Sequence, residues 1–339
     1  MILYGLIGAV FIISLSLTYV LRRYALANSL IDIPNSRSSH TIPTPRGGGV
    51  AIVLSFLIAL PALYYLQLIS FTVMTGLLGA GALVALLGFA DDHGHIAARW
   101  RLVGHFTAAV WALYWLGGVG QISIFGVLLE LQWLSSLLFA VYLVWMLNLY
   151  NFMDGIDGLA SVEAIFVCLS ACLIYWLSGH QDLSCIVLVL AASVAGFLCL
   201  NFPPARIFMG DAGSGFLGLT IGLLAIIASS EAPELLWSWL ILLGVFIVDA
   251  TWTLMRRLLR GDKIYEAHRS HAYQFASRHY GTHKTVVYAV LTINVLWLLP
   301  LAVLSGIGML PGVLALFIAY IPLVFIANRY NAGMLEVEK

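Results

Sequence analysis

Long apolar segments alternate with short polar ones along the whole chain. Each apolar segment has roughly 20 residues, the length that an α-helix needs to cross a bilayer. Because lipid leaves exposed backbone groups unsatisfied, spans of this length are predicted to be helical. The predicted spans lie near residues 2–21, 48–67, 70–89, 102–118, 133–150, 159–178, 184–201, 215–230, 236–256, 285–303 and 308–327. The predicted fold class is an all-α integral membrane protein, a polytopic bundle of about 11 transmembrane helices.

Composition agrees with this prediction. Hydrophobic residues make up 62% of the 339 residues, charged residues make up 9%, and the mean hydropathy is +0.99. A soluble domain carries about 25% charged residues, so a soluble protein is excluded. No polar segment is long enough to stand alone, which predicts one transmembrane domain over residues 1–339. We expect the lipid bilayer as a partner and no nucleic acid.

The basic residues predict the orientation. If the N-terminus lies outside, all 16 Lys and Arg residues lie in inner segments or at inner helix ends, in agreement with the positive-inside rule. Arg22 and Arg23 follow the first apolar segment instead of preceding it, which favours a retained helix over a cleaved signal. The N-terminus is therefore expected to be periplasmic and the active-site cleft cytoplasmic.

Five aspartates lie on the inner side in this arrangement, each within a few residues of a helix end: Asp91, Asp92, Asp154, Asp157 and Asp211. At one membrane depth, carboxylates this close would repel one another unless a cation or a proton intervened. Mg²⁺ suits such a site because it takes oxygen ligands and keeps positions open for phosphates. Adjacent helix residues point in different directions, so Asp91 and Asp92 are expected to have different partners.

Polar residues recur in NLYNFMDGIDGL, residues 148–159. Asn148, Asn151, Asp154 and Asp157 are spaced by three and would share one face if the segment is helical. Polar groups at membrane depth are costly and usually functional. A secondary transporter or ion channel with a broken helix along an ion path is the competing interpretation. The acids lie at one edge of the bilayer and the motifs show no two-fold repeat, which favours an enzyme.

Two glycine-rich segments carry further candidates. In TPRGGG, Thr44 and Arg46 precede three glycines at a helix start, which suits phosphate binding and close helix packing equally. In NFPPARIFMGDAGSG, Arg206 supplies a cation and Phe208 supplies a ring for a base. Gly210 precedes the aspartate of this second segment, and no Lys follows its glycines, so it is not a Walker A loop.

The longest inner loop contains RRLLRGDKIYEAHRSHAYQ. His268, Arg269 and His271 form a compact donor cluster for an anionic group. Asp249, on the predicted helix before this loop, is interpreted as a structural partner and not as a catalyst.

In this order, TPRGGG, GFADD, NLYNFMDGIDGLA, NFPPARIFMGDAGSGFLG and HRSH resemble the motifs of the polyprenyl-phosphate N-acetylhexosamine-1-phosphate transferases, glycosyltransferase family 4. The resemblance covers nearly the whole chain. It implies a transferase that uses Mg²⁺, with Mn²⁺ as the alternative, to join UDP-N-acetylhexosamine to undecaprenyl phosphate and release UMP. It also implies the bacterial inner membrane and the first step of a lipid-linked surface glycan of the O-antigen type, in lipopolysaccharide biosynthesis. A homodimer is an open alternative to a monomer.

The resemblance implies roles for the matched residues. The catalytic set is Asp91, Asp92 and Asp154, and the metal ligands are Asp211, Asn151 and Asp92. In the family the acidic pair lies close to the lipid phosphate, and the positions of Asn201 and Phe208 line the uridine pocket. With the polar groups named above, the substrate-binding set is Thr44, Arg46, Asn148, Asn151, Asp157, Asn201, Arg206, Phe208, Gly210, His268, Arg269 and His271.

Two departures from the family pattern matter. The peptidoglycan-type branch has consecutive histidines, whereas this chain has HRSH, which argues against a muramyl-pentapeptide substrate and for a single N-acetylhexosamine. The Lys that often follows the acidic pair is absent, and Arg99 and Arg101 are both candidates to replace it. Direct attack by the lipid phosphate is predicted, because a phosphate monoester with a second pKa of about 6 is already largely a dianion. A phospho-aspartyl intermediate at Asp91 or Asp92 is the alternative.

Overall fold

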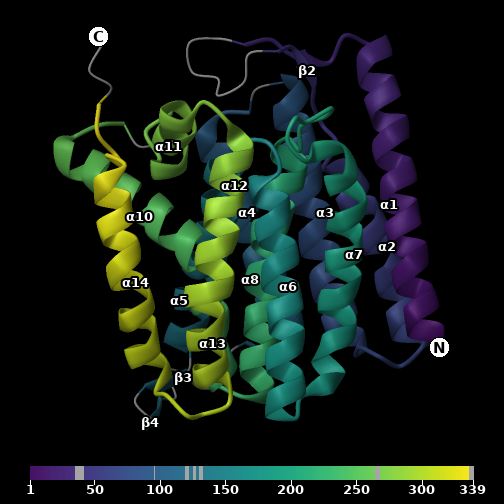
Figure 1. Ribbon diagram of the computed structural model, residues 1–339. Coiled ribbons are helices and arrows are strands. Elements are labelled where there is room, and N and C mark those ends of the chain that lie inside the picture. The colour runs from purple at the N-terminus through teal and green to yellow at the C-terminus, as the bar shows by residue number, and fades with distance from the viewer. Residues whose placement is uncertain are drawn as a thin grey trace.

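In the computed structural model the chain folds into a bundle of long helices (Figure 1). The structure describes residues 1–34, 42–94, 96–118, 122–124, 127–129, 133–263 and 268–335. The helices are α1 (Ile2–Ala27), α2 (Val50–Tyr65), α3 (Phe71–Gly94), α4 (Ala98–Trp115), α5 (Trp133–Met153), α6 (Leu159–Ser178), α7 (Ser184–Asn201), α8 (Asp211–Glu231), α9 (Glu234–Leu242), α10 (Gly244–Arg260), α11 (Ala272–Tyr280), α12 (His283–Ile293), α13 (Leu299–Gly306) and α14 (Gly312–Arg329). A π-helical turn, Asn294–Leu298, joins α12 to α13, and a 3₁₀ turn, Gln181–Leu183, precedes α7. Two antiparallel strand pairs complete the described part: β1 (Ile31–Asp32) with β2 (Thr44–Pro45), and β3 (Ile122–Ile124) with β4 (Val127–Leu129).

The helix lengths support a polytopic membrane protein. Within the described residues, eight helical segments are long and apolar enough to cross a bilayer, or nine if the bent pair α9 and α10 counts as one span. The predicted segments near 48–67 and 102–118 correspond to α2 and α4, which are not among these eight. The sequence-based count of eleven spans therefore stays a prediction, whereas the all-helical membrane fold is confirmed.

The predicted span 236–256 is two helices and not one. The axes of α9 and α10 differ by 72°, and α10 runs obliquely toward the end of the bundle where α11 lies (Figure 1). One face of α10 is buried through Phe246 and Val248, while Arg257 and Arg260 occupy its last turn. Arg260 is exposed, and an arginine head at a helix end is stable where it reaches water. Arg257 is buried, and its Nε lies 3.5 Å from Asp262 Oδ2.

Helix α8 lies at the centre of the bundle. It is 94% buried over its apolar window, against 17% for α1 and 22% for α14, which form the outside. Small residues allow its neighbours to approach closely: a Cβ added at Gly218 would lie 2.4 Å from the Met146 carbonyl oxygen of α5. In lipid, close packing of this kind replaces the hydrophobic effect as the main force between helices.

The N-terminal end of α8 is fixed by two neighbours. A Cβ added at Gly88 of α3 would lie 2.6 Å from Ala212. The N–H groups of Gly48 and Gly49 donate to the carbonyl oxygens of Phe208 and Met209, at 2.9 and 2.8 Å. The N–H groups of Gly48 and Gly49 are therefore bonded to the segment before α8. This favours a packing role for the glycines of TPRGGG over phosphate binding.

Substituting Gly218 with Val should overpack the contact between α8 and α5 and destabilise the protein by about 1–3 kcal/mol. The matched control is Gly8→Val on α1, where an added Cβ meets nothing within 4 Å. The measurement is the thermal unfolding midpoint of each purified variant in the same detergent. Equal midpoints for the two variants would show that close approach at Gly218 contributes nothing.

Candidate active site

Aspartates from three elements meet at the end of the bundle where α8 begins. A small cavity of about 30 Å³ is lined by Asp91 of α3, Asn148 and Asn151 of α5, Asp211 of α8 and Arg101 of α4, among others. These residues are separated by up to 120 positions in the sequence. The structure therefore brings four of the predicted site residues together, as the sequence analysis required.

Asp92 connects the end of α3 to the start of α8. Its two carboxylate oxygens accept hydrogen bonds from the backbone N–H groups of Asp211 and Ala212, each at 3.4 Å. A helix N-terminus stabilises an anion because its first N–H groups lack intrahelical acceptors. Gly210 has φ +78°, and a Cβ there would lie 2.9 Å from Asp92 Oδ2, so both backbone conformation and space require glycine. Arg46 donates to the backbone carbonyl oxygen of Asp92.

Asp91 has a different partner, as predicted for adjacent helix residues. Its Oδ2 accepts from Arg101 Nη1 at 2.6 Å, and its Oδ1 accepts from the N–H of Ile96 at 2.6 Å. The same Arg101 nitrogen lies 4.0 Å from Asp211 Oδ2. Arg99, in contrast, is exposed and lies over the ring of Trp100. Of the two candidates, Arg101 therefore supplies the cation beside the acidic pair.

The NLYNFMDGIDGL segment is helical only in its first half. α5 ends at Met153, so Asn148 and Asn151 share a helix but Asp154 and Asp157 do not. The condition for one continuous polar face, a fully helical segment, is therefore not met, because the glycine-rich half leaves the helix and Gly158 adopts φ +71°. Asn151 Oδ1 accepts from Ser214 Oγ at 2.9 Å, which ties α5 to α8.

Asp154 lies among the other acids. Burial, together with repulsion from Asp211, Asp92 and Asp157, raises the pKa of Asp154 well above its usual value. A carboxyl group in such surroundings is stabilised by a nearby cation or by a proton. The site therefore concentrates more negative charge than Arg101 alone offsets.

Asp157 faces a second, larger cavity of about 480 Å³. Its Oδ2 accepts from the N–H of Ala205 at 3.0 Å, and its Oδ1 lies 3.2 Å from His283 Nδ1. Thr44 and Phe208, both predicted, line the same cleft, and so do Arg278 and Lys284.

Sequence reasoning missed His283 and the two cations of this cleft. His283 opens α12 directly after Thr282, which occupies the N-cap position. The only local signal is this helix start, and a helix start says nothing about the segment 126 positions away that it contacts. The pairing depends on how α12 packs.

Asn201 and Arg206 are among the predicted residues that line neither cavity. Asn201 is buried, and its amide accepts from Ser161 Oγ and donates to the Ile207 carbonyl oxygen. Arg206 is exposed, and its backbone carbonyl accepts from Arg22 Nε at 3.1 Å. In this structure Asn201 ties α7 to α6, whereas Arg206 lies at the surface beside Arg22.

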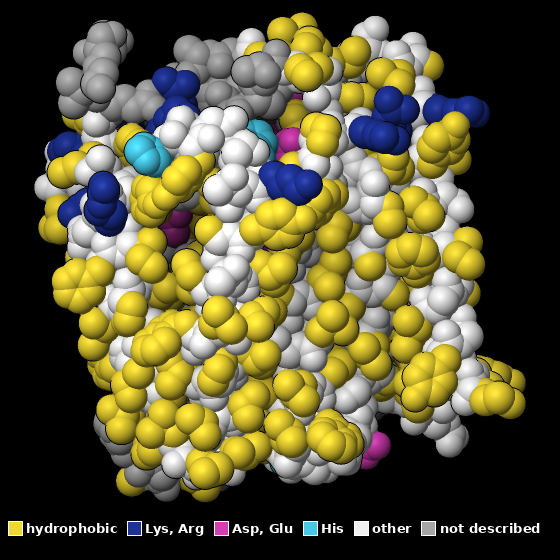
Figure 2. Space-filling model, in the orientation of Figure 1, with side chains coloured by type: hydrophobic (Ala, Val, Ile, Leu, Met, Phe, Trp, Pro, Cys, Tyr) yellow, Lys and Arg dark blue, Asp and Glu magenta, His cyan; other side chains and the backbone are white. Residues whose placement is uncertain are grey.

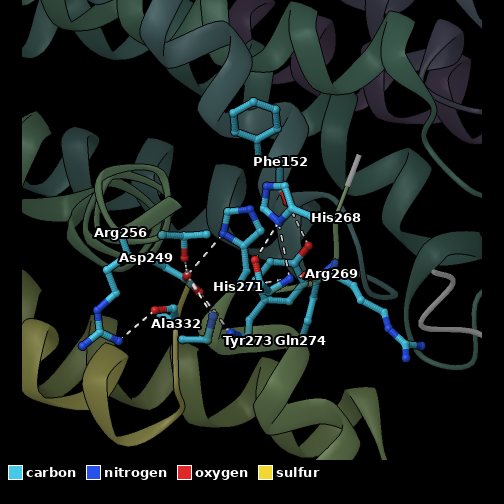
Figure 3. Close-up of polar contacts among 12 residues, drawn as sticks. Phe152, Asp249, Arg256, His268, Arg269, His271, Tyr273, Gln274 and Ala332 are labelled. Carbon is cyan, nitrogen blue, oxygen red and sulfur yellow. Dashed lines mark hydrogen bonds and ion pairs between the residues drawn. The ribbon is translucent and has the colours of Figure 1, made fainter. Parts of the chain in front are cut away.

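The HRSH segment is held by Asp249 (Figure 3). The Asp249 carboxylate accepts from the N–H groups of Ala272 and Tyr273 at 2.9 and 3.0 Å, and its Oδ1 lies 3.3 Å from His271 Nδ1. Asp249 is thus the structural partner that the sequence predicted, and it holds the start of α11. The rings of His268 and His271 are stacked at 4.9 Å.

This cluster adjoins the aspartates through Phe152. The Phe152 ring is stacked on His271 at 6.1 Å, and the Phe152 carbonyl oxygen accepts from the Tyr273 hydroxyl at 2.8 Å. The Arg269 side chain extends away from both histidine rings (Figure 3). Burial, the neighbouring His271 and Arg257 lower the pKa of His268 to about 3, so His268 is neutral at pH 7 and offers a hydrogen bond instead of a charge.

The residues around α8 fit a magnesium ion in charge and in donor chemistry. No three His, Cys, Asp or Glu side chains among the described residues form a ready-made metal cluster. Mg²⁺ does not require one, because it usually binds one or two carboxylates and completes its shell with water and substrate phosphates. Asp211, Asp92 and the Asn151 amide offer oxygen atoms of this kind, and the excess negative charge at Asp154 favours a cation.

Comparison with known proteins identifies the family. The pattern of glycosyl transferase family 4 matches residues 74–229. A decaprenyl-phosphate N-acetylglucosaminephosphotransferase of Mycobacterium leprae is 32% identical over 77% of this chain and 74% of its own length. The chain belongs to the polyprenyl-phosphate N-acetylhexosamine-1-phosphate transferases of glycosyl transferase family 4.

Two further relatives are similar over different shares of their lengths. A probable undecaprenyl-phosphate N-acetylglucosaminyl 1-phosphate transferase of Bacillus subtilis is 29% identical over 92% of this chain and 86% of its own. A phospho-N-acetylmuramoyl-pentapeptide-transferase of Moorella thermoacetica is 36% identical, over 56% of this chain and 62% of its own. Membership makes the chain a transferase, and together with the apolar helices it indicates a bacterial multi-pass membrane protein.

The lowered pKa of His268 predicts a pH dependence of stability. A histidine with a folded-state pKa of about 3 and an unfolded-state pKa of about 6.5 binds protons more readily when unfolded. Stability should therefore fall as the pH drops from about 6.5 toward 4, and the thermal midpoint should fall by a few degrees per pH unit. His268→Gln should flatten this slope, whereas His180→Gln at the far end of the bundle should keep it. A slope that is unchanged in His268→Gln would contradict the assignment.

Proposed function

We propose that this transferase moves N-acetylhexosamine-1-phosphate from a UDP-sugar to undecaprenyl phosphate, giving undecaprenyl-diphospho-N-acetylhexosamine and UMP. The observation that carries the proposal is the pairing of two sites at one end of an apolar bundle. A partly buried carboxylate cluster around Asp211 suits a metal-bound diphosphate, and the cleft beside Asp157 is large and polar enough for a soluble nucleotide. A site of this kind serves one reactant from the membrane and one from solution.

The nucleotide is assigned to the 480 Å³ cleft. Phe208 offers a ring on which a base can stack, Asp157 accepts hydrogen bonds, and Lys284 and Arg278 offset phosphate charge. Cation and hydrogen-bond donors around a diphosphate provide most of the rate enhancement in phosphoryl transfer, because the reaction depends on positioning and charge neutralisation.

Mg²⁺, with Mn²⁺ as the alternative, would be held by Asp211, Asn151 and Asp92, and when bound it would neutralise the diphosphate. An oxygen of the lipid phosphate attacks the sugar-bearing phosphorus, a new phosphorus–oxygen bond forms, and the bond to the UMP oxygen breaks. Asp91 is engaged by Arg101 at 2.6 Å, and the lipid phosphate needs no strong base. We therefore assign Asp91 a role in orienting the nucleophile.

The finer assignments follow from the same resemblance. We propose an inner-membrane enzyme with about eleven spans. The distribution of Lys and Arg supports a periplasmic N-terminus and a cytoplasmic cleft. It starts a lipid-linked surface glycan, for which we propose the O-antigen type of lipopolysaccharide biosynthesis. The names of the Bacillus and Mycobacterium relatives support N-acetylglucosamine as the first sugar to test, and a homodimer stays a prediction.

Removing the Asp211 carboxylate should abolish turnover without unfolding the protein. We expect Asp211→Asn to lower kcat at least about 100-fold, since losing one electrostatic group at a reacting phosphate costs about 10²–10³. The assay is UMP release by purified protein with UDP-N-acetylglucosamine and undecaprenyl phosphate, and Asp182→Asn, in the connection between α6 and α7, is the control. Full activity of Asp211→Asn, or of the wild type in excess EDTA, would contradict the metal assignment. UMP release without lipid phosphate would contradict direct attack.

His283 should act on the nucleotide through Asp157. We expect His283→Ala to raise the KM for the UDP-sugar by about fivefold to tenfold, because the Asp157 N–H loses its acceptor, His283 Nδ1, at 3.3 Å. The KM for undecaprenyl phosphate should not change, and His283→Asn should restore part of the loss. His180→Ala is the control. An equal rise in both KM values would indicate a general structural defect instead.

A further inference from the structure

An apolar cavity of about 260 Å³ adjoins the HRSH segment, because Asp249 and Tyr273, which line it, contact His271 and Phe152. It is walled by α12 and α14, floored by α10 and covered by α11. Its lining is almost wholly apolar and includes Val248, Val286, Ala289, Leu323 and Ile326. Figure 2 shows a mainly hydrophobic surface over α12 and α14, so we place this face against membrane lipid.

A smaller, cationic cavity of about 200 Å³ adjoins the apolar one. The two cavities share Tyr280 and Tyr330, whose hydroxyl groups are hydrogen bonded at 2.8 Å. Arg329, at the end of α14, and His279 also line the smaller cavity, and the described lining contains no acid. Figure 2 shows Lys, Arg and His side chains gathered at this end of the face.

The apolar cavity contains one acid among its described lining residues, Asp249, and that acid is already satisfied by hydrogen bonds. Asp249 lies at the floor and is 5% exposed. Its oxygens already accept from the start of α11, at 2.9 and 3.0 Å, and from Thr253 Oγ1 at 3.2 Å. The apolar cavity therefore meets the cationic cavity at Tyr280 and Tyr330, near the end of the bundle that carries the basic side chains.

We propose that these two cavities form one binding site for an anionic glycerophospholipid of the surrounding membrane. An acyl chain fills the apolar cavity, and the headgroup phosphate lies at Arg329 and His279. Basic pockets between membrane helices are a known way to recognise anionic headgroups, and an apolar cavity gains contacts when a chain replaces empty space. The site would tie α11 to α12 and α14.

The occupant is not the polyprenyl phosphate of the proposed reaction. The cationic cavity lies at the Tyr280 end of α11, whereas His271 and Phe152 lie at the opposite end. Nine helical residues separate these ends by about 12 Å. A phosphate bound at Arg329 would therefore lie too far from the carboxylate cluster to react, and none of those carboxylates lines either cavity.

The test uses photolabelling of the full chain in phosphatidylcholine nanodiscs. These contain a trace of phosphatidylglycerol with a diazirine at the end of one acyl chain, and labelled peptides are mapped after irradiation. We expect labels concentrated on α12 and α14 at cavity residues such as Ala289 and Leu323. Unlabelled phosphatidylglycerol should compete, and additional phosphatidylcholine should not. This readout needs no enzyme activity, so it stands or falls separately from the proposed function.

Two variants sharpen the result. Arg329→Gln should weaken labelling about fivefold, the effect of about 1 kcal/mol for one basic residue, and Ala289→Trp should block the apolar cavity. Their controls, Arg23→Gln and Ala9→Trp, lie on exposed positions of α1 and should label as the wild type does. Even labelling of all lipid-facing helices, equal competition by phosphatidylcholine, no loss of labelling in Arg329→Gln, or displacement by undecaprenyl phosphate alone would overturn the proposal.

Discussion

The contact between the Asp92 carboxylate and the first N–H groups of α8 positions the rest of the site. It joins the end of α3 to the start of the most buried helix, and Arg46 and Gly210 pack around it. A helix N-terminus carries partial positive charge, so it tolerates an acid where lipid alone would not. With α8 fixed in this way, Asp211 points to the same cavity as Asn148 and Asn151 of α5.

The arrangement separates two demands that conflict chemically. Holding a metal ion requires concentrated negative charge, which raises the pKa of Asp154 and is stabilised by a cation or by a proton. Binding a nucleotide requires an open polar surface with donors and a ring. The acids lie at the end of α3, just after α5 and at the start of α8, whereas the cleft lies beside Asp157. Asp154 and Asp157, three residues apart in one glycine-rich turn, connect the two.

The grouping of the aspartates could be predicted from the sequence, because the membrane fixes the depth at which each helix ends. Once the apolar spans are drawn, motifs far apart in the chain fall at one bilayer edge, which is enough to group Asp91, Asp92, Asp154 and Asp211. What could not be predicted depends on packing between helices. The 72° bend between α9 and α10 and the contact of His283 with Asp157 each result from neighbours that no local pattern identifies.

The role of the glycine-rich segment TPRGGG also depends on a partner from elsewhere in the chain, through backbone hydrogen bonds. TPRGGG has the composition of a phosphate loop, and composition alone leaves that role and close packing equal. Gly48 and Gly49 donate instead to the carbonyl oxygens of Phe208 and Met209, and this pairing holds Phe208 at the cleft that we propose for the nucleotide. The segment therefore serves a substrate indirectly: it fixes the ring and the start of α8, while Thr44 is its residue that lines the cleft. A glycine-rich sequence next to a functional aspartate thus marks where the backbone must approach closely, and the identity of its partner has to come from the fold.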